Sequence, residues 1–335
     1  MKFAVVGAGA IGGLLGARLA LAGDDVTFIA RGPSLKAIRE RGFRLIEADG
    51  SESVARNLRA ATIDEGGEYE AVLLAVKAQQ IAPIAADVAD LLGPATTLVT
   101  LQNGVPWWFF HKLAGPFEGR VIEAVDPGGA IAAVIPPDRI LGAVVYPAAE
   151  LVAPGRVRVI EGDRFTLGDP DGSKSARAAV ISEAFGRAGF KAPVSSDIRA
   201  EIWLKLWGNL AFNPISALTH ATLEDMCRFA PTRALAATMM AEAREVGEKL
   251  GIRVRIPIEK RIAGAEAVGA HKTSMLQDVE AGRPLETAAL TGAMVELARM
   301  TQTPSPAIDA VHACIRLLGD TLEARGGRLA IQAKS

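Results

Sequence analysis

Short apolar runs alternate with helix-like stretches through the first half of the chain. The runs at 3–6, 26–30 and 71–76 are apolar and partly β-branched, which is typical of parallel strands buried on both faces. Residues 11–21 are rich in Leu, Ala and Arg and lack proline, which predicts a helix that ends near Gly23. The pattern therefore predicts a βαβ unit at the start of a mainly parallel sheet.

The alternation of predicted strands and helices continues to about residue 195. Glycine and proline separate the later apolar runs, which favours antiparallel additions to the sheet. We expect a hairpin or short strands within 44–57, strands at 97–101, 141–146, 156–160, 165–168 and 190–194, and helices at 79–92 and 174–188.

After residue 195 the pattern changes to consecutive helices. Ser195, Ser196 and Asp197 form a plausible helix cap at the boundary, and Pro214 should end or kink the first helix. The helices are expected at 197–213, 216–228, 232–250, 256–269, 272–281, 286–301 and 305–323. The predicted fold is a Rossmann-type dinucleotide-binding domain at 1–195 followed by an all-α domain at 196–335. Such pairs usually place the active site in the cleft between the domains.

Composition narrows the class of partner. A chain of 335 residues suggests two domains, and its net charge of −1 favours neither nucleic acid nor a membrane surface, which leaves a small molecule. Cys227 and Cys314 lack metal-ligand spacing, so no disulfide framework and no metal are expected, and Cys314 is interpreted as a core residue. The first strand begins at the amino terminus and no apolar run approaches the roughly 20 residues of a membrane span, so a cytoplasmic enzyme is expected.

The motif Gly7-Ala8-Gly9-Ala10-Ile11-Gly12 follows the first predicted strand directly. Gly7 would make the tight turn, Gly9 would let the backbone approach a pyrophosphate, and Gly12 would allow close packing of helix on strand. The helix N-terminus that follows favours phosphates. A lone glycine motif can be only a turn, but the strand, helix and strand in register argue for a dinucleotide site.

Arg31 stands at the end of the second strand, where NAD-specific sites carry an acidic residue. An arginine there would pair with a 2′-phosphate, so NADP(H) is preferred over NAD(H). A solvated loop arginine is the alternative, which leaves the choice between the two cofactors open. Lys77 and Asn103 follow later strands of the predicted sheet, and should lie on the cofactor side because ligands bind beyond the carboxyl ends of the strands.

The run Trp107-Trp108-Phe109-Phe110 is unusually aromatic for this chain. It could form a lid, an interface or core, and burial in a core or an interface is favoured.

Lys205, Asn209 and Asn213 are spaced by four and would form one polar stripe on an otherwise apolar helix. Such a stripe is costly to bury unless it faces a ligand or a satisfied network. Alternatively, Lys205 extends to water and the asparagines cap neighbouring elements. The spacing alone does not decide between the two.

A second polar cluster covers 271–286 and includes Ser274, Gln277 and Glu286. An amphipathic helix, a turn and a helix whose first turn carries Glu286 would also explain it. Composition gives no reason to choose Ser274 and Glu286 over Asp278 or Glu280.

Taken together and in this order, the motifs resemble those of the ketopantoate reductases (2-dehydropantoate 2-reductases). The resemblance covers nearly the whole chain and includes the glycine motif with Arg31, Lys77, the Asn103-Gly104 turn, the lysine-asparagine helix and the 274–286 cluster. It implies a helical second domain of the 6-phosphogluconate dehydrogenase type, and NADPH-dependent reduction of the 2-oxo acid ketopantoate to D-pantoate in pantothenate and coenzyme A biosynthesis. A homodimer is common among such folds.

The resemblance also implies a role for each matching residue. Lys205 would be the proton donor, and Glu286 would contact the nicotinamide side and orient Lys205. Hydride arriving at a carbonyl carbon leaves charge on oxygen, which an ammonium stabilises and then protonates. The residues from Gly7 to Gly12, Arg31, Lys77 and Asn103 would hold the cofactor, and the substrate would be held by Asn103, Lys205, Asn209, Asn213, Ser274 and Gln277.

This sequence departs from the family's pattern at three places, which leaves the identity of the substrate open. About twenty extra residues stand between Asn103 and the strand at 141–146, judged against the family pattern and usual connection lengths. If this strand matches the strand that lines the cofactor in the family, Ala148 is a cofactor contact. A further substrate asparagine has no counterpart near 223–224, and Ala288 stands where the family has an acid. A reductase of a different branched 2-oxo acid and a non-catalytic NADP(H) sensor are the alternatives, and Lys205 argues against the sensor.

Overall fold

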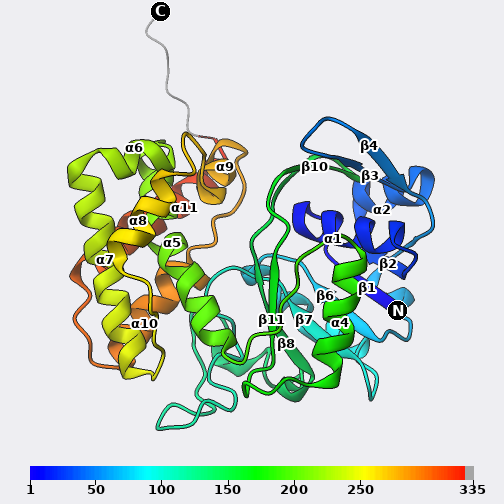
Figure 1. Cartoon of the computed structure of the whole chain (residues 1–335), viewed down its shortest axis with the longest axis horizontal. Coiled ribbons are helices and arrows are strands. Elements are labelled where there is room, and N and C mark those ends of the chain that lie inside the picture. Colours follow the sequence, from blue (N-terminus) through cyan, green and yellow to red (C-terminus); the bar gives the residue numbers. More distant parts are fainter. Residues whose placement is uncertain (329–335) are drawn as a thin grey trace, which may run out of the picture. The chain divides into compact units, whose positions relative to one another are not determined.

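The computed structural model describes residues 1–328 and divides into two compact units (Figure 1). The first unit consists of Met1–Asn103, Trp107–Val121 and Gly128–Glu201. The second unit begins at Ile202 and also includes the short segments Gly104–Pro106 and Ile122–Pro127. Parts of the chain on either side of Asn103 therefore fold with different units.

The first unit is built on a seven-stranded sheet in the order β11-β8-β7-β6-β1-β2-β5. Six strands are parallel, and β11 pairs antiparallel with β8 at one edge. In chain order the parallel strands read 3-2-1-4-5-6, the arrangement of doubly wound dinucleotide-binding folds. The strands are β1 (Lys2–Val6), β2 (Asp25–Ile29), β5 (Arg59–Ala61), β6 (Ala71–Leu74), β7 (Thr97–Thr100), β8 (Ile140–Val145) and β11 (Phe165–Gly168).

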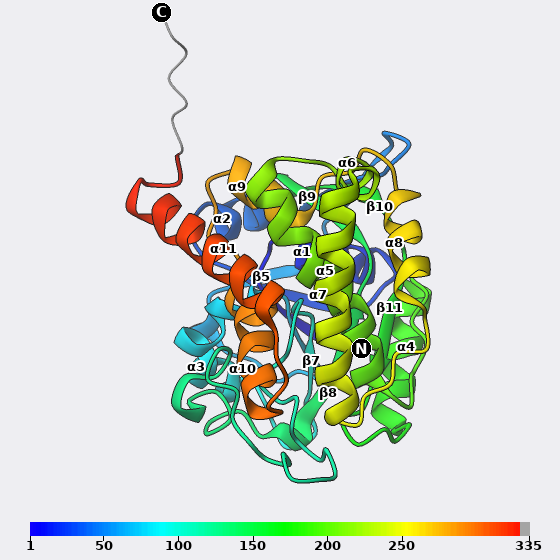
Figure 2. The same cartoon turned by 90° about the vertical axis from the view of Figure 1, so that its left-hand side faces the viewer.

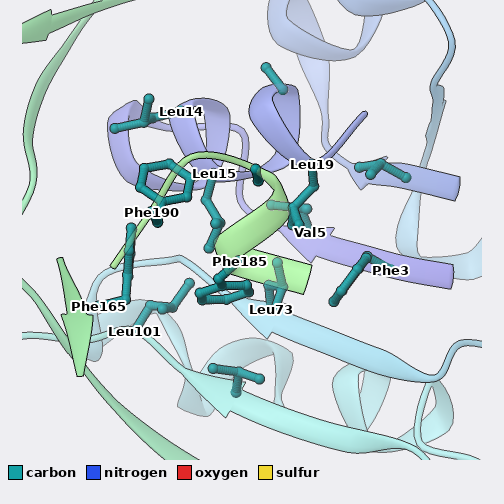
Figure 3. Packing of buried hydrophobic residues seen from close by; sticks show 14 of the residues in the cluster. Phe3, Val5, Leu14, Leu15, Leu19, Leu73, Leu101, Phe165, Phe185 and Phe190 are labelled. Atoms are coloured by element: carbon teal, nitrogen blue, oxygen red, sulfur yellow. The ribbon is translucent and has the colours of Figure 1, made fainter. Parts of the chain in front are cut away.

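Helices α1 (Ala10–Leu21), α2 (Gly32–Arg41), α3 (Ala85–Asp90) and α4 (Ala176–Arg187) accompany this sheet. Figure 3 shows Leu15 of α1 and Phe185 of α4 in the apolar cluster that also contains Val5 of β1. The Phe165 ring packs edge-on against Phe190 at a centroid distance of 4.9 Å. Because β1 is buried, its apolar sequence forms the centre of the sheet as predicted.

A second, four-stranded sheet has the order β4-β3-β10-β9. Its strands are β3 (Phe43–Ile46), β4 (Glu52–Ala55), β9 (Ala148–Ala153) and β10 (Arg156–Glu161). The hairpin predicted within 44–57 is confirmed as β3 and β4. The placement of 156–160 on the main sheet was wrong, because β10 pairs with β3 and with the unpredicted β9. The tight turn at Pro154-Gly155 lets β9 and β10 pair with each other as an antiparallel hairpin.

Two further predictions in this unit were wrong. The helix expected at 79–92 is broken into the 3-10 turns Ala78–Gln80 and Ala82–Ile84 followed by α3, because Pro83 has no N–H for a continuous helix. The strand expected at 190–194 consists of isolated bridges at Lys191 and Val194. Other 3-10 turns lie at Ile63–Glu65, Pro127–Gly129 and Pro137–Arg139.

The aromatic run after Asn103 is core. Trp107, Trp108, Phe109 and Phe110 are all buried, and the Trp108 indole Nε1–H donates to the Thr100 hydroxyl over 3.1 Å. The first unit's own packing therefore accounts for the run, without a lid or an interface.

The described residues of the second unit form helices joined by loops and contain no strand (Figure 2). Most of its helices are short amphipathic segments that bury one apolar face. They are α6 (Leu223–Arg228), α7 (Ala230–Lys249), α8 (Ile258–Glu266), α9 (Ser274–Glu280), α10 (Ala293–Met300) and α11 (Pro306–Ala324), with a π-helical turn at Ala288–Gly292. On α11 Cys314 is exposed, so its interpretation as a core residue was wrong.

Helix α5 (Ile198–Thr219) begins in the first unit and runs into the second. The Asp197 carboxylate accepts the Ala200 N–H over 3.0 Å, which confirms the predicted cap. Pro214 was predicted to end or kink this helix, and the first alternative is wrong, because the helix continues for five residues to Thr219. Phe212 and Ile215 on either side of the proline are buried, and that packing compensates for one lost hydrogen bond.

Candidate functional site

The glycine motif occupies the connection from β1 to α1 in the first unit. Gly7 has φ of 104°, a conformation that favours glycine, and its N–H donates to Ile29 O over 3.2 Å. At Gly12 an added Cβ would lie 2.0 Å from Gly7 O, so only glycine fits there. At Gly9 an added Cβ would meet nothing within 4 Å. The motif is therefore tightly packed except at the position where a pyrophosphate would approach.

Arg31 follows β2 directly and is the N-cap residue of α2, with extended backbone. Its side chain is exposed and forms no hydrogen bond or ion pair within residues 1–328. A guanidinium next to a helix N-terminus is a favourable environment for a phosphate.

Lys77 and Asn103 lie beyond the carboxyl ends of β6 and β7, which pair with each other as parallel neighbours. Lys77 is the half-buried N-cap of the 3-10 turn Ala78–Gln80, and Asn103 is half-buried as well. The sequence-based placement of both residues at this edge of the sheet agrees with the structure. Ala148 comes three residues after the carboxyl end of β8, the parallel neighbour of β7, and opens β9, where it pairs with Glu161.

Lys205, Asn209 and Asn213 all lie on α5, as the spacing of four predicts. Lys205 and Asn209 are half-buried, and Asn213 is buried with 6% of its surface exposed. Desolvation lowers the pKa of Lys205 to about 8, and the opposite charge of Glu286 acts in the other direction. Lys205 is thus an ammonium removed from bulk water beside one carboxylate.

Ser274 is the first residue of α9, whose N-cap Thr273 accepts the Leu276 N–H. The Asn213 Nδ2 amide donates to the Ser274 hydroxyl over 3.4 Å, which joins the stripe on α5 to the 274–286 cluster. The polar stripe therefore faces a second polar element of the same unit.

Two other acids of the 274–286 cluster have charged partners close by in sequence. Asp278 accepts the Arg283 Nε–H over 2.9 Å, and Glu280 pairs with Lys272 at 2.7 Å. These acids are used in local ion pairs, whereas the charge of Glu286 acts on Lys205. Gln277 lies one turn after Ser274, and its amide donates to Lys272 O over 3.2 Å.

Sequence reasoning missed the π-helical turn that follows Glu286. This turn contains the buried Thr291, whose hydroxyl lies 2.8 Å from Nδ1 of His312 on α11. A π-helical turn has no simple periodic signal. Gly104, which has φ of 86°, packs directly on Ala289 of this turn, a contact between distant parts of the sequence.

Within residues 1–328, no group of three or more His, Cys, Asp or Glu is arranged to hold a metal ion. Over the same residues no helix is both long enough and apolar enough to cross a membrane.

Comparison with known proteins decides the family. The profile described as "Ketopantoate reductase PanE/ApbA" matches residues 3–172, and "Ketopantoate reductase PanE/ApbA C terminal" matches 197–319. The chain belongs to the ketopantoate reductase family. It is an oxidoreductase whose cofactor is a nicotinamide dinucleotide.

Several relatives support this membership over nearly full length. The 2-dehydropantoate 2-reductase of Mesorhizobium japonicum is 54% identical over 95% of this chain and 98% of its own. That of Archaeoglobus fulgidus is 29% identical over 87% and 89%. The crystal structure of "a putative ketopantoate reductase from Ralstonia solanacearum MolK2" has a TM-score of 0.91 at 42% identity, covering 96% and 98%.

A similar fold also occurs in an enzyme that carries a different name. A ternary structure of D-mandelate dehydrogenase with NADH and anilino(oxo)acetate has a TM-score of 0.83 at 22% identity, covering 96% of this chain and 99% of its own. At that identity the likeness concerns the fold alone.

Proposed function

We propose that this protein reduces ketopantoate to D-pantoate with NADPH. The observation that carries the proposal is Lys205, a desolvated ammonium on α5 beside Glu286, in the same unit as the Asn213-Ser274 pair. The 54% identity to a 2-dehydropantoate 2-reductase supports ketopantoate as the substrate.

The residues of the first unit fit a dinucleotide. The backbone from Gly7 to Gly12 would hold the pyrophosphate, because the motif is open at Gly9 and leads into the N-terminus of α1. The guanidinium of Arg31 would pair with the 2′-phosphate. Lys77, Asn103 and Ala148 would contact the ribose and nicotinamide end.

The chemistry of the second unit fits carbonyl reduction. When bound, NADPH would supply a hydride to the C2 carbonyl carbon, and the electron pair of the C=O π bond would move to oxygen. Lys205 stabilises the developing oxyanion and gives it the proton from Nζ, which yields the alcohol. Glu286 keeps the ammonium charged and oriented, so the lysine is an acid at neutral pH. Glu286 would also contact the nicotinamide side of the bound cofactor.

The neutral polar groups suit the rest of the substrate. Asn209, Asn213, Ser274, Gln277 and Asn103 would hold its carboxylate and hydroxyl. Amides and hydroxyls both donate and accept, so they bind a hydroxy acid without a competing charge.

The test is NADPH oxidation by purified protein with ketopantoate, beside a panel of other branched 2-oxo acids. We expect ketopantoate to have the highest kcat/KM. Lys205→Ala should lower kcat by about 10²–10⁴, the usual contribution of a positioned acid, while NADPH still binds. Lys249→Ala, which removes an exposed lysine paired with Glu245, is the matched control.

Each alternative has its own result. Preference for another 2-oxo acid would replace ketopantoate as the substrate, and tight NADPH binding without any oxidation would indicate a sensor. Running NADH in parallel tests the cofactor choice, and Arg31→Ala should weaken NADPH about tenfold or more while leaving NADH unchanged. Equal losses for both cofactors would contradict the assignment of Arg31.

We also propose that the protein is a homodimer. The name of one solved relative, at 18% identity, describes a dimeric ketopantoate reductase from Staphylococcus aureus. Light scattering coupled to size-exclusion chromatography should give twice the chain mass of 35.1 kDa, and a single-chain mass would overturn the proposal.

A further inference from the structure

The π-helical turn Ala288–Gly292 begins two residues after Glu286 and leads into α10. Its defining bond runs from the Gly292 N–H to Thr287 O over 2.9 Å, five residues back. Turns of this kind are rare and occur frequently at functional sites. Because this turn follows Glu286, whose charge acts on Lys205, the contacts that hold the turn in place bear on the position of Glu286.

Thr291 holds the turn from inside. It is fully buried, with hydroxyl contacts of 3.2 Å to Thr287 O and 2.8 Å to His312 Nδ1. A hydroxyl has one hydrogen and a carbonyl only accepts, so Thr291 donates to Thr287 and His312 donates to Thr291 through Nδ1–H. Thr287 O thus accepts two hydrogen bonds, one residue after Glu286.

Two other segments hold the turn from outside. The Val105 N–H donates to Ala289 O over 2.8 Å, and a Cβ on Gly104 would lie 2.3 Å from the same oxygen. On the following helix the Glu296 carboxylate accepts the N–H groups of Glu123 and Ala124, both over 2.8 Å. The turn is therefore a fixed element of the second unit.

We infer that Thr291 is a positioning residue that, together with His312, fixes the π-helical turn and so holds the Glu286 carboxylate beside Lys205. The inference rests on the proposed role of Lys205 as proton donor. It assigns to both residues a role that acts through Glu286.

Among residues 1–328, the charge of Glu286 raises the pKa of Lys205. The charged groups around His312 are Arg316 and Asp309 on α11 and Arg299 on α10. Burial and the two arginines lower the pKa of His312, so the imidazole is neutral at pH 7 and donates through its single N–H.

The decisive variant is Thr291→Val, which keeps the shape of the side chain and removes its hydroxyl. Thr287 O then loses a donor and Glu286 is less firmly held. Because Glu286 raises the pKa of Lys205 against desolvation, its displacement lowers that pKa. The decrease of kcat at alkaline pH, here called the alkaline limb of the pH profile, should therefore move to lower pH by about half a unit or more.

Matched variants separate this effect from general destabilisation. Thr291→Ser keeps the hydroxyl and should retain the wild-type limb. Thr301→Val removes another buried threonine hydroxyl, bonded to Leu297 O at the other end of α10, and should leave the limb in place. His312→Leu should shift the limb in the same direction as Thr291→Val, and His312→Asn, which can donate from its δ nitrogen, should restore it.

A second readout does not need turnover. The Cε resonance of Lys205 in protein labelled with ¹³C-lysine, assigned with Lys205→Arg, reports its pKa directly. A lower pKa in Thr291→Val and His312→Leu supports the inference, and a wild-type pKa in both overturns it. If wild type reduces no 2-oxo acid, the proposed function fails on its own and the titration still decides the role of Thr291. His312→Leu serves this purpose if Thr291→Val does not fold.

Discussion

The Asn213 side-chain amide donates to the Ser274 hydroxyl over 3.4 Å, across 61 positions of sequence. Asn213 is buried on α5, whereas Ser274 is exposed at the start of α9. A long hydrogen bond leaves both groups with further capacity, since the hydroxyl can still donate and the amide oxygen can still accept. The pair is therefore suited to hold a polar ligand.

Ser274→Ala should raise the KM for ketopantoate about tenfold, equivalent to about 1.4 kcal/mol for one lost hydrogen bond, with a smaller change in kcat. The KM for NADPH should not change. Steady-state kinetics with each substrate varied in turn measures both effects. Thr238→Ala on α7, which removes an exposed hydroxyl bonded to Ala234 O, is the control. A kcat loss at constant KM would exclude Ser274 from substrate binding.

The second prediction concerns pH. Lys205 must be protonated to act as an acid, so kcat should be level at neutral pH and fall as pH rises through its pKa of about 8. Glu286→Gln removes the charge that raises this pKa, so the fall should begin at lower pH. Glu280→Gln removes an acid paired with Lys272 and should leave the profile unchanged. A limb that stays in place in Glu286→Gln would contradict the assigned pairing.

How far the sequence predicts the molecule depends on the range of the interactions. The βαβ start and the cap at Asp197 depend on neighbours in sequence, and both were predicted correctly. The small sheet was not, because β10 pairs with β3, more than a hundred residues earlier. The continuation of α5 through Pro214 was also missed, since tertiary packing overrides the local preference of proline.

In the candidate site, too, the features set by neighbours in sequence were predictable and those set by other contacts were not. The stripe on α5 follows from helical geometry, but its spacing did not decide whether Lys205 reaches water. Nor could composition choose Glu286 over Asp278 or Glu280. The structure adds that Arg283 and Lys272 pair with the other two acids, which composition does not reveal.

A pair of glycine substitutions separates packing from cofactor binding in the Gly7–Gly12 motif. Gly12→Ala places a methyl 2.0 Å from Gly7 O, so the protein should unfold at lower temperature or fail to accumulate. Gly9→Ala meets no atom within 4 Å, so the unliganded protein should keep its Tm. Its methyl instead occupies the space for the pyrophosphate, and NADPH affinity should fall about tenfold or more. Scanning calorimetry with and without NADPH measures both, and wild-type affinity in Gly9→Ala would contradict the proposed pyrophosphate site.

The last prediction concerns Arg199, which lies buried in the first turn of α5. Its guanidinium donates to Phe109 O over 2.7 Å and also to Pro170 O and His111 O, so one side chain binds three carbonyls from two loops of the first unit. Burial lowers the pKa of Arg199, but the planar fork of donors keeps it bonded and charged. Arg199→Leu leaves three carbonyls without these donors and should lower the free energy of unfolding by about 3–5 kcal/mol.

Urea unfolding followed by circular dichroism measures this loss as a lower Cm. Arg199→Lys keeps the charge but lacks the planar fork, so it should fall between wild type and Arg199→Leu. Arg158→Leu breaks an exposed pair with Glu150 and should cost at most about 1 kcal/mol. If Arg199→Leu unfolds at the same urea concentration as Arg158→Leu, the three carbonyls find other donors and Arg199 is dispensable to the first unit.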